Sequence, residues 1–359
     1  MRVKVMQNQD ANYHFIQELN AKLGRTLFIG RSEVLIKELK KLVAIARTDE
    51  TVLILGETGS GKGVCALAIH LLSRRAAKPF HALNCGLFTT ERLESELFGH
   101  TKGAFTGAAE AVIGAVQAAE GGSLFLDEIN SVPLAVQPKL LYFLDEGTFA
   151  VVGHPKIHKA NVRMIAASNE DLSEKVRAKE FRQDMRARLN NITITMPPLR
   201  ERPEDIPLLA AHFLAHSMAS QGRRGMKLSP GALEKLIRFD WPDNLRQLKS
   251  VMASAVACGE GPIIDASDVV LSGPAEPTPP GFNEAKAKAI AKWEERETKK
   301  RLAAANGNIS KAARDGGQDP RVLRALMRKH QIATPGYGRL PGQIPRRSQV
   351  SSPRPEPSC

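Results

Sequence analysis

The residues best suited to chemistry form a glycine-rich segment, GETGSGKG, at residues 56–63. Glycines let backbone N–H groups turn toward a phosphate, and a lysine adds positive charge for the β- and γ-phosphates of a nucleotide. An apolar run, TVLIL, precedes the segment and a helical pattern, VCALAIHLL, follows it. This order disfavours the alternative, a glycine-rich turn without a ligand. The predicted nucleotide site consists of Gly56, Glu57, Thr58, Gly59, Ser60, Gly61, Lys62 and Gly63.

Two adjacent carboxylates, Asp127 and Glu128, end a second apolar run in GGSLFLDEI. Asp127 is suited to hold Mg²⁺ through water, and Glu128 to polarise the water that attacks a γ-phosphate. Taken alone, two acids at the end of a strand are equally compatible with a solvated strand terminus. Because the phosphate loop precedes them in the same chain, the pair indicates hydrolysis of the nucleotide.

The elements that must position these residues follow from the apolar pattern. Runs such as TVLILG, SLFLDEI and VRMIAAS alternate with helical patterns, which predicts an α/β fold with a parallel sheet flanked by helices. From Pro203 to about Leu271 the strand patterns stop and helical patterns take over. We therefore expect a short N-terminal extension (residues 1–26), an α/β subdomain (27–199) and a helical subdomain (200–271).

A third segment, GHTKGAFTGA at residues 99–108, surrounds one phenylalanine with small residues. Its GAFTGA part resembles the signature loop of the sigma-54-dependent transcriptional activators, the NtrC-like enhancer-binding branch of the AAA+ ATPases. In that family the Phe and Thr of the loop touch sigma-54. The resemblance implies a mobile loop with an exposed aromatic ring, and a sigma-54 contact formed by Gly103, Ala104, Phe105, Thr106, Gly107 and Ala108.

The resemblance extends from about Leu27 to Ser272 and assigns further residues. Asn84 resembles the family's switch asparagine, which holds the catalytic glutamate, and Asn169 its sensor asparagine. Arg182 and Arg188 match two arginines that the family supplies to the ATP of a neighbouring subunit. Arg246 stands at the second sensor position of the AAA+ helical lid.

A function follows from this resemblance as an expectation. The chain should bind ATP and Mg²⁺, assemble into a hexamer or related ring, and hydrolyse ATP at its subunit interfaces. Hydrolysis should move the GAFTGA loops and remodel the closed complex of sigma-54 RNA polymerase. An arginine donated by a neighbour accounts for about 10³–10⁵ in rate in well-studied phosphoryl transfers, so activity should require the ring.

Four positions depart from the family pattern. Gly63 replaces a usual Glu, and most P-loops carry a Ser or Thr hydroxyl there for Mg²⁺. Gln117 replaces an acidic residue, and Val112 and Val151 replace arginines. We expect binding and hydrolysis to survive these changes, whereas the coupling of hydrolysis to loop movement is the step they put in question.

The positive charge of the chain is concentrated at its C-terminal end. Of the net charge of +13, residues 284–359 carry +10, with 17 Lys and Arg against 7 Asp and Glu. A proline-rich stretch at 272–283 predicts a linker, and the Pro-, Ser- and Arg-rich residues 334–359 predict a disordered basic tail. A solvated charged face is the plain interpretation, and a nucleic-acid-binding end is the one we favour.

Between linker and tail, residues 284–333 resemble the Fis-type helix-turn-helix that ends many such activators. NGNISKAA fits a turn into a first helix, and Asp319-Pro320 fits the start of a second. Gly316 and Gln318 replace the usual Leu and Ile, which weakens the small core of the motif. Contacts to upstream, enhancer-like DNA sites are expected from Arg321, Arg324, Arg328 and Lys329.

Composition restricts the remaining classes. No apolar run approaches the roughly 18 residues that a bilayer requires, so we expect no membrane contact. The four cysteines lack disulfide or metal-site spacing, which is typical of reduced thiols in a cytoplasmic protein. Because only about 26 residues precede the ATPase region, we expect no receiver, GAF or PAS domain. A separate regulatory protein, control by abundance and a truncated gene remain open.

Two other functions stay open at this stage. The departures at Gly63, Gln117 and Val151 permit a DNA-binding regulator that keeps the AAA+ shell and has lost activation. An AAA+ remodeller of an unrelated substrate is the second alternative, and the GAFTGA segment argues against it.

Overall fold

The computed structural model describes residues 2–105, 107–259, 261–271, 294, 296–305, 307–329 and 332, without the side chains of residues 2–9 and 328. The chain divides into two compact units, Met1–Gly273 and Pro274–Cys359. The expected linker at 272–283 and tail at 334–359 lie outside the described residues. Each unit is described by itself below.

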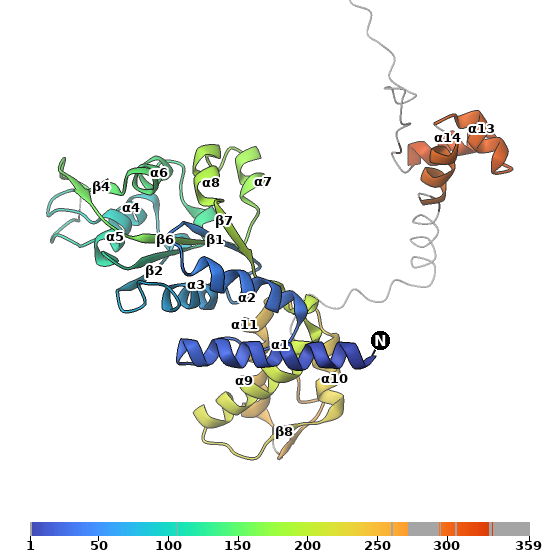
Figure 1. Ribbon diagram of the computed structural model, residues 1–359, viewed down its shortest axis with the longest axis horizontal. Helices are drawn as coiled ribbons and strands as arrows, with labels where there is room; N and C mark the ends of the chain where they lie inside the picture. The colour runs from blue at the N-terminus through green and yellow to red at the C-terminus, as the bar shows by residue number, and fades with distance from the viewer. Residues whose placement is uncertain are drawn as a thin grey trace, which may run out of the picture. The chain divides into compact units, whose positions relative to one another are not determined.

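A five-stranded parallel sheet forms the centre of the first unit, as the sequence predicts (Figure 1). Its order is β2-β3-β6-β1-β7, and every neighbouring pair is parallel. The strands are β1 (Val52–Leu55), β2 (Phe80–Asn84), β3 (Ser123–Asp127), β6 (Arg163–Ser168) and β7 (Ile192–Thr195). A separate antiparallel hairpin joins β4 (Thr148–Ala150) to β5 (Ile157–Lys159).

Helices cover both faces of this sheet. Successive side chains of a strand point to opposite faces, so in β3 Leu124 and Leu126 enter one core, whereas Phe125 enters the other. The helices of the first core are α4 (Thr90–Phe98), α5 (Ala115–Ala118), α6 (Gln137–Glu146), α7 (Leu172–Arg177) and α8 (Gln183–Leu189). Those of the second are α1 (Arg2–Leu23), α2 (Glu33–Ile45) and α3 (Lys62–Leu71).

Helix α1 takes up most of the segment that was expected to be a short extension. Ile16, Leu19 and Leu23 are buried in the second core together with residues of α2 and α3. Asn20 is also buried, and its side chain bonds both the N–H and the C=O group of Phe28. Helix α1 therefore packs as part of the α/β subdomain and fixes the chain that follows it.

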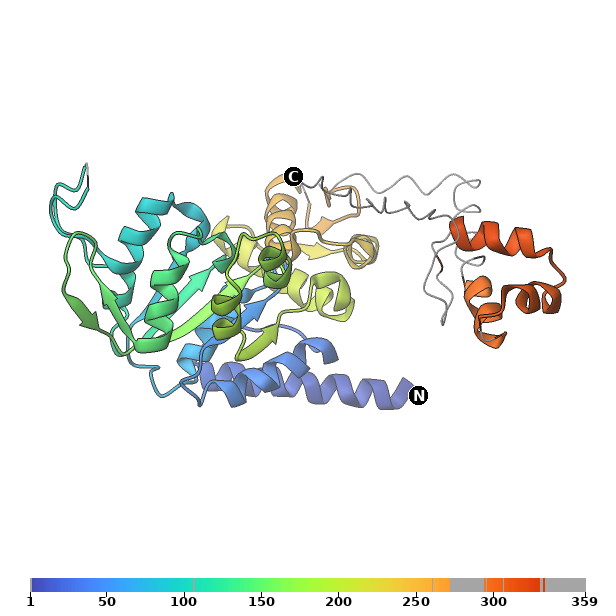
Figure 2. The same cartoon turned by 90° about the horizontal axis from the view of Figure 1, so that it is seen from above.

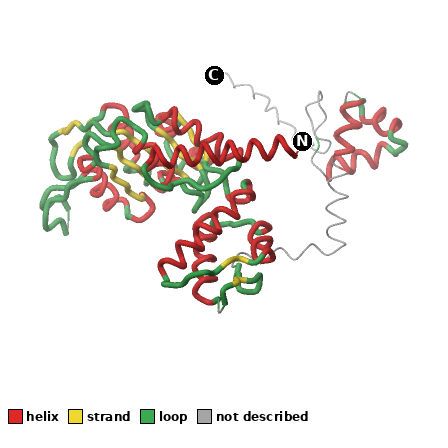
Figure 3. Tube along the Cα trace, turned by 60° about the horizontal axis from the view of Figure 1, so that its bottom comes forward, coloured by secondary structure: helices red, strands yellow, loops and turns green. Residues whose placement is uncertain are grey.

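The lid comprises helices α9 (Ile206–Ser220), α10 (Pro230–Arg238) and α11 (Asn244–Cys258) (Figure 3). They enclose their own core around the fully buried Trp241. The expectation that strands stop after Pro203 needs a correction, because Lys227–Leu228 (β8) pairs with Ile263–Ile264 (β9). Two residues per strand are too few to give an alternating pattern in the sequence.

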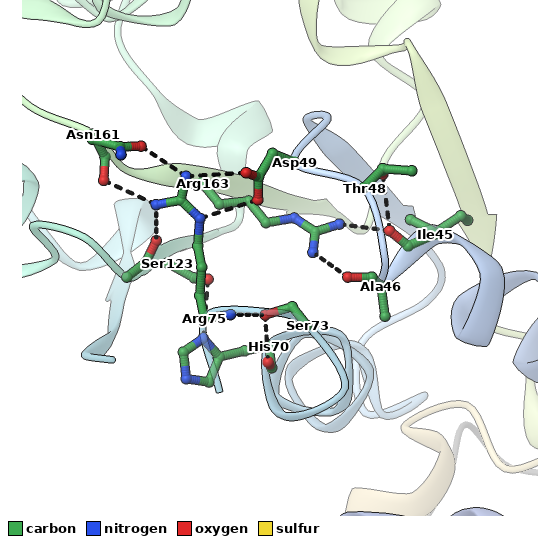
Figure 4. Close-up of polar contacts among 11 residues, drawn as sticks. Ile45, Ala46, Thr48, Asp49, His70, Ser73, Arg75, Ser123, Asn161 and Arg163 are labelled. Carbon is green, nitrogen blue, oxygen red and sulfur yellow. Dashed lines mark hydrogen bonds and ion pairs between the residues drawn. The ribbon is translucent and has the colours of Figure 1, made fainter. Parts of the chain in front are cut away.

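Charged side chains join the helices to the sheet at the amino ends of the strands (Figure 4). The Arg163 guanidinium, in a side chain buried under β6, donates to the C=O groups of Ile45 (2.9 Å) and Ala46 (3.0 Å) at the end of α2. Arg75 bonds the carboxylate of Asp49 at 3.1 Å and both oxygens of Asn161, at 2.7 and 3.0 Å. This edge is a structural clamp, since its charges are paired within the protein.

In the second unit the structure describes helical residues at 296–304 and the helices α13 (Ile309–Asp315) and α14 (Pro320–Lys329). Asn308 caps α13 by accepting a bond from the N–H of Lys311. Buried residues join these helices in a small core, namely Leu302, Ala305, Ala312, Ala313, Leu323, Met327 and Ile332. Across both units, none of the described helices is long and apolar enough to cross a membrane.

Candidate nucleotide-binding site

A cavity of about 520 Å³ lies where the carboxyl ends of the strands meet the lid. Ligands of open parallel sheets bind at this edge. Its walls combine polar and apolar side chains. The lining residues include Thr58, Gly59, Ser60, Gly61, Lys62, Gly63, Asp127, Glu128 and Arg246, and an apolar wall of Leu27, Phe28, Ile29, Leu209, Phe213 and Leu245.

The glycine-rich segment forms a loop between β1 and α3, in the order that the sequence predicts. Lys62 is the first residue of α3, and its ammonium group donates to the C=O groups of Gly56 (2.8 Å) and Glu57 (3.1 Å). Burial is the main cause that lowers the pKa of Lys62, and the charges of Asp127 and Glu128 oppose this shift. The loop thus presents a buried cation at the amino end of a helix, as phosphate binding requires.

Asp127 and Glu128 stand at the end of β3 and line the same cavity. Burial raises the pKa of Asp127, although the Lys62 charge and the bond from the Glu128 N–H (3.0 Å) favour its ionised form. Glu128 has a left-handed backbone, with φ of 54°. A non-glycine residue in this region is uncommon and is often found at functional sites.

Asn84 lies beside Asp127 and Glu128 because β2 and β3 are neighbours, and it pairs in register with Asp127. Its side-chain oxygen accepts a bond from the N–H of Gly86 at 2.8 Å. A Cβ atom at Gly86 would collide with the carboxylate of Glu128 and crowd the Asn84 oxygen. Gly86 therefore allows Glu128 to approach this turn, a role that the sequence analysis missed because the glycine belongs to no motif.

The two residues expected at the sensor positions come from different elements. Asn169 follows β6, and its amide lies 3.4 Å from the Thr58 hydroxyl. Arg246 enters the cavity from α11 of the lid.

Gly63, one of the departures from the family pattern, has open space around its Cα atom. An added Cβ would meet only the Phe125 ring, at an ordinary distance of 3.8 Å.

Arg182 and Arg188 do not line the cavity of their own chain. Arg182 precedes α8 and forms an ion pair with Asp184 at 2.7 Å. Arg188 forms an ion pair with Asp145 at 3.0 Å, and its guanidinium donates to the C=O of Leu144 at the end of α6. Both side chains are more than 40% exposed, so both can be reached from outside the chain.

The GAFTGA loop projects from the body after α4 (Figure 2). Phe105 is 37% exposed, and its ring packs against the buried His100 with 4.9 Å between ring centroids. Thr106 lies outside the described residues. At the base of the loop, His100 forms β-bridges with Val112 and with Val152, the neighbour of Val151, so two of the four departures lie at or beside the base.

The lid contains a site residue that the sequence analysis did not identify. Asn244 is fully buried, has a φ of 51°, and bonds the P-loop through its side chain. Only the WPDN sequence before α11 could have signalled it, and an asparagine in a turn is too common to be informative.

Comparison with known proteins identifies the family of this chain. The "Sigma-54 interaction domain" profile matches residues 28–195, and the "AAA+ ATPase lid domain" profile matches residues 200–276. The transcriptional regulatory protein GlrR of Escherichia coli is 39% identical over 309 residues, which are 86% of this chain and 69% of GlrR. The chain belongs to the sigma-54-dependent transcriptional activators. This membership confirms the resemblance read from the GAFTGA and P-loop segments.

Other relatives within the sigma-54 activators are longer than this chain. The alginate biosynthesis regulator AlgB of Pseudomonas aeruginosa is 46% identical over 228 residues, 64% of this chain and 51% of AlgB. The formate hydrogenlyase activator FhlA of E. coli is 44% identical over 273 residues, 75% of this chain and 39% of FhlA. The matched region therefore spans about half or less of these two relatives.

Solved structures of NtrX from Brucella abortus share the fold of this sigma-54 activator. The NtrX complex with ATP has a TM-score of 0.63 and 30% identity, and the match covers 85% of this chain and 69% of NtrX. The NtrX complex with ADP has a TM-score of 0.64 and 28% identity, over 85% of this chain and 70% of NtrX. These likenesses confirm the AAA+ fold and support nucleotide binding.

Proposed function

We propose that this chain hydrolyses ATP and uses the resulting movement to activate transcription by sigma-54 RNA polymerase in the cytoplasm. One observation carries the proposal: a single run of chain joins the catalytic edge to the sigma-54 loop. Asn84, beside Glu128, is followed by α4 and then by the GAFTGA loop. A change at the γ-phosphate that moves Asn84 therefore has a short covalent path to Phe105.

The chemistry assigned to the site is in-line hydrolysis. Lys62 and the loop N–H groups bind the phosphates, and Glu128 accepts the proton of the attacking water. Asp127 would hold Mg²⁺ through water, and the ion, when bound, neutralises charge on the β- and γ-phosphates. No group of three or more His, Cys, Asp or Glu side chains in the described part of the chain could enclose a metal. That fits Mg²⁺, which keeps several waters and binds through one or two carboxylates plus phosphates.

The ring is proposed from the position of the two arginines. Arg182, just before α8, and Arg188, on α8, are exposed and lie outside the cavity of their own chain. In a ring they would stabilise the transferring phosphoryl group bound to the adjacent subunit. Protein with Arg188→Ala mixed with protein with Glu128→Gln should recover part of the ATPase activity, because each supplies what the other lacks. Mixed rings without any recovery would argue against donation in trans.

DNA binding is proposed for the second unit. Arg321, Arg324 and Lys329 are exposed on or at the end of α14, whereas the side chain of Arg328 lies outside the described residues. Gly316 is accommodated, since the Arg301 guanidinium occupies the space that a side chain there would fill. We propose that α13 and α14 form the helix-turn-helix, with α14 in the major groove of upstream DNA sites.

The deciding experiment is transcription in vitro with sigma-54 polymerase, with and without hydrolysable ATP. The parent should form open complexes only with ATP. Phe105→Ala should keep assembly and ATPase activity and lose open-complex formation, because its partly exposed ring contributes little to the core. Ile263→Ala, which removes a 58% exposed side chain from the lid, is the matched control and should stay active. An active Phe105→Ala protein, or one that melts far below the parent, would contradict the proposal.

A further inference from the structure

The P-loop is bonded to residues of the lid. Four consecutive P-loop residues contact lid residues through bonds of 2.5–3.2 Å. The contacts are the Glu57 carboxylate with the Arg200 guanidinium, the Thr58 C=O with the Asn244 amide, the Gly59 C=O with the Leu245 N–H, and the Ser60 C=O with the Arg202 guanidinium. The P-loop backbone, which would surround the phosphates, is therefore hydrogen-bonded to the lid.

The side chain of Asn244 contacts two of these P-loop residues. Its amide nitrogen donates to the Thr58 C=O (3.0 Å) and to the Glu57 carboxylate (3.1 Å). Its amide oxygen accepts a bond from the N–H of Leu199 at 2.7 Å. Asn244 is fully buried, and its bond with Leu199 is buried as well, whereas its bonds with Thr58 and Glu57 are partly buried. One amide thus connects the P-loop, the entry to the lid and the start of α11.

The backbone around Asn244 is adapted to this contact. Asn244 and Trp241 both have positive φ, 51° and 53°, which asparagine tolerates better than most residues and tryptophan rarely adopts. On the other side, a Cβ atom at Gly59 would collide with the C=O of Asp243. A glycine in the loop and a left-handed turn in the lid together allow the two backbones to touch.

Arg202 forms a second buried contact of the same kind. Its guanidinium donates to the Ser60 C=O at 3.2 Å, and the side chain lines the nucleotide cavity while only 2% exposed. The Asp205 carboxylate, which lies on the same lid segment, accepts bonds from the N–H groups of Arg31 (2.6 Å) and Ser32 (2.9 Å). The lid entry is therefore bonded to the P-loop and to the segment that precedes α2, and Asn244 adds a further bond to the P-loop.

We propose that Asn244 is a positioning residue for nucleotide binding: it holds the P-loop backbone in its phosphate-binding shape and links that shape to the position of the lid. The inference rests on the proposed ATP binding and adds a residue to it. The Asn244 side chain bonds none of the backbone N–H groups of the P-loop, so it acts through the Thr58 C=O group and the Glu57 carboxylate. Its loss should reduce binding in the ground state and the transition state alike, which raises KM and leaves kcat nearly unchanged.

Asn244→Asp is the sharpest variant. Aspartate has nearly the same shape, tolerates positive φ and still accepts the bond from Leu199. It replaces the donating nitrogen by an oxygen that faces the Thr58 C=O and the Glu57 carboxylate. We expect KM for ATP and the dissociation constant of ADP to rise about tenfold, and kcat to change less than about twofold. Asn191→Asp, at an exposed position, adds the same charge and should change neither constant.

Glu57→Ala keeps the proposal testable if Asn244→Asp folds poorly. The Glu57 side chain is 39% exposed, so its truncation should not prevent folding. It should raise KM by a factor of about 3, because it removes one partner of Asn244. Combined with Asn244→Asp, the increase in KM should be smaller than the product of the two separate factors, since the repulsion between the carboxylates is gone.

The outcomes separate the two proposals. A parent protein that binds no ATP or ADP in calorimetry overturns the proposed function, and this inference with it. A parent that binds nucleotide, with an Asn244→Asp protein that melts lower yet keeps KM and the ADP dissociation constant, overturns only the inference and makes Asn244 a fold-stabilising residue. A loss confined to kcat, or effects of the two substitutions that multiply fully, also overturns it.

Discussion

The two edges of the central sheet use charge in opposite ways. At the amino edge, Arg75 is paired with the carboxylate of Asp49, and Arg163 with C=O groups at the end of α2 (Figure 4). At the carboxyl edge, neither Asp127 nor Glu128 forms an ion pair with another described residue. Burial raises the pKa of Asp127, whereas the Arg75 hydrogen bond lowers the pKa of Asp49.

This difference separates stability from function within one sheet. Removing one partner of a bonded charge leaves the other partner unsatisfied and destabilises the native state, whereas a buried charge without an ion-pair partner already raises the energy of that state. The amino edge should therefore contribute to unfolding free energy and little to chemistry. The carboxyl edge should contribute to chemistry and little to unfolding free energy, because Asp127 and Glu128 form no ion pair among the described residues there and can interact with a ligand. Four substitutions test the contrast.

The largest effect is expected from Glu128→Gln. Removing the general base should lower kcat by about 10²–10⁴, while ADP affinity and the midpoint of urea unfolding stay near those of the parent. ATPase rates and denaturation curves measured on one preparation give both numbers. Equal ATPase rates in the Glu128→Gln and parent proteins would show that Glu128 is not the general base. They would also contradict the assignment of chemistry to the carboxyl edge of the sheet.

Arg163→Met should show the opposite pattern. It leaves the C=O groups of Ile45 and Ala46 without their buried donor, and we expect a loss of about 2–4 kcal/mol of unfolding free energy with KM for ATP unchanged. Arg238→Met breaks a pair on α10 whose arginine is 77% exposed, and serves as the control. It should cost less than about 0.5 kcal/mol. A changed KM in Arg163→Met would show that the amino edge also shapes the site.

Asp49→Asn should have a smaller effect that depends on pH. Because the Arg75 bond lowers the folded-state pKa of Asp49 below its ordinary value, the pair stabilises the protein above that ordinary value. The stabilisation is lost as pH falls through the lowered pKa. The Asp49 side chain is 63% exposed, so the cost near neutral pH should stay below about 1 kcal/mol. Parent and variant should converge in acid, and a difference that widened in acid would contradict this pairing.

Asp127→Asn should give the smallest change, with the opposite sign. The pKa of Asp127 is raised by burial, so its ionised form costs stability above the folded pKa and its protonated form does not. Without nucleotide, the variant should melt slightly higher than the parent at neutral pH, and the difference should disappear at a pH below the ordinary value. A lower melting temperature at neutral pH would mean that Lys62 compensates the buried carboxylate fully.

The sequence predicted those parts of the site that depend on short motifs. A glycine-rich loop after a strand, a pair of acids at a strand end and a GAFTGA segment each carry their chemistry locally. The parallel sheet also followed, since buried parallel strands are continuous apolar runs. The pair β8 and β9 was missed because two-residue strands leave no periodic pattern.

The remaining features depend on contacts between distant segments. Asn20 bonds Phe28 from within the segment expected to be an extension, and Gly86 leaves space for the Glu128 carboxylate. A hydrogen bond between residues far apart in the chain has no local sequence signature, because either partner alone is an ordinary polar residue. Arg182, Arg188 and Asn84 were assigned from the family resemblance. The groups that the two arginines would contact in the proposed ring belong to a second chain.

By itself the sequence indicated which groups could bind a phosphate and activate water, because the glycines and the lysine of the loop share one short segment and the two acids are adjacent at the end of one apolar run. Only the tertiary structure decided how these groups are held. It brought Asn244 to the P-loop across 186 residues of chain, placed Asp127 where burial raises its pKa, and bonded Arg163 to the end of α2. Burial and hydrogen-bond pairing are properties of the packed molecule, and they assign one edge of the sheet to stability and the other to chemistry.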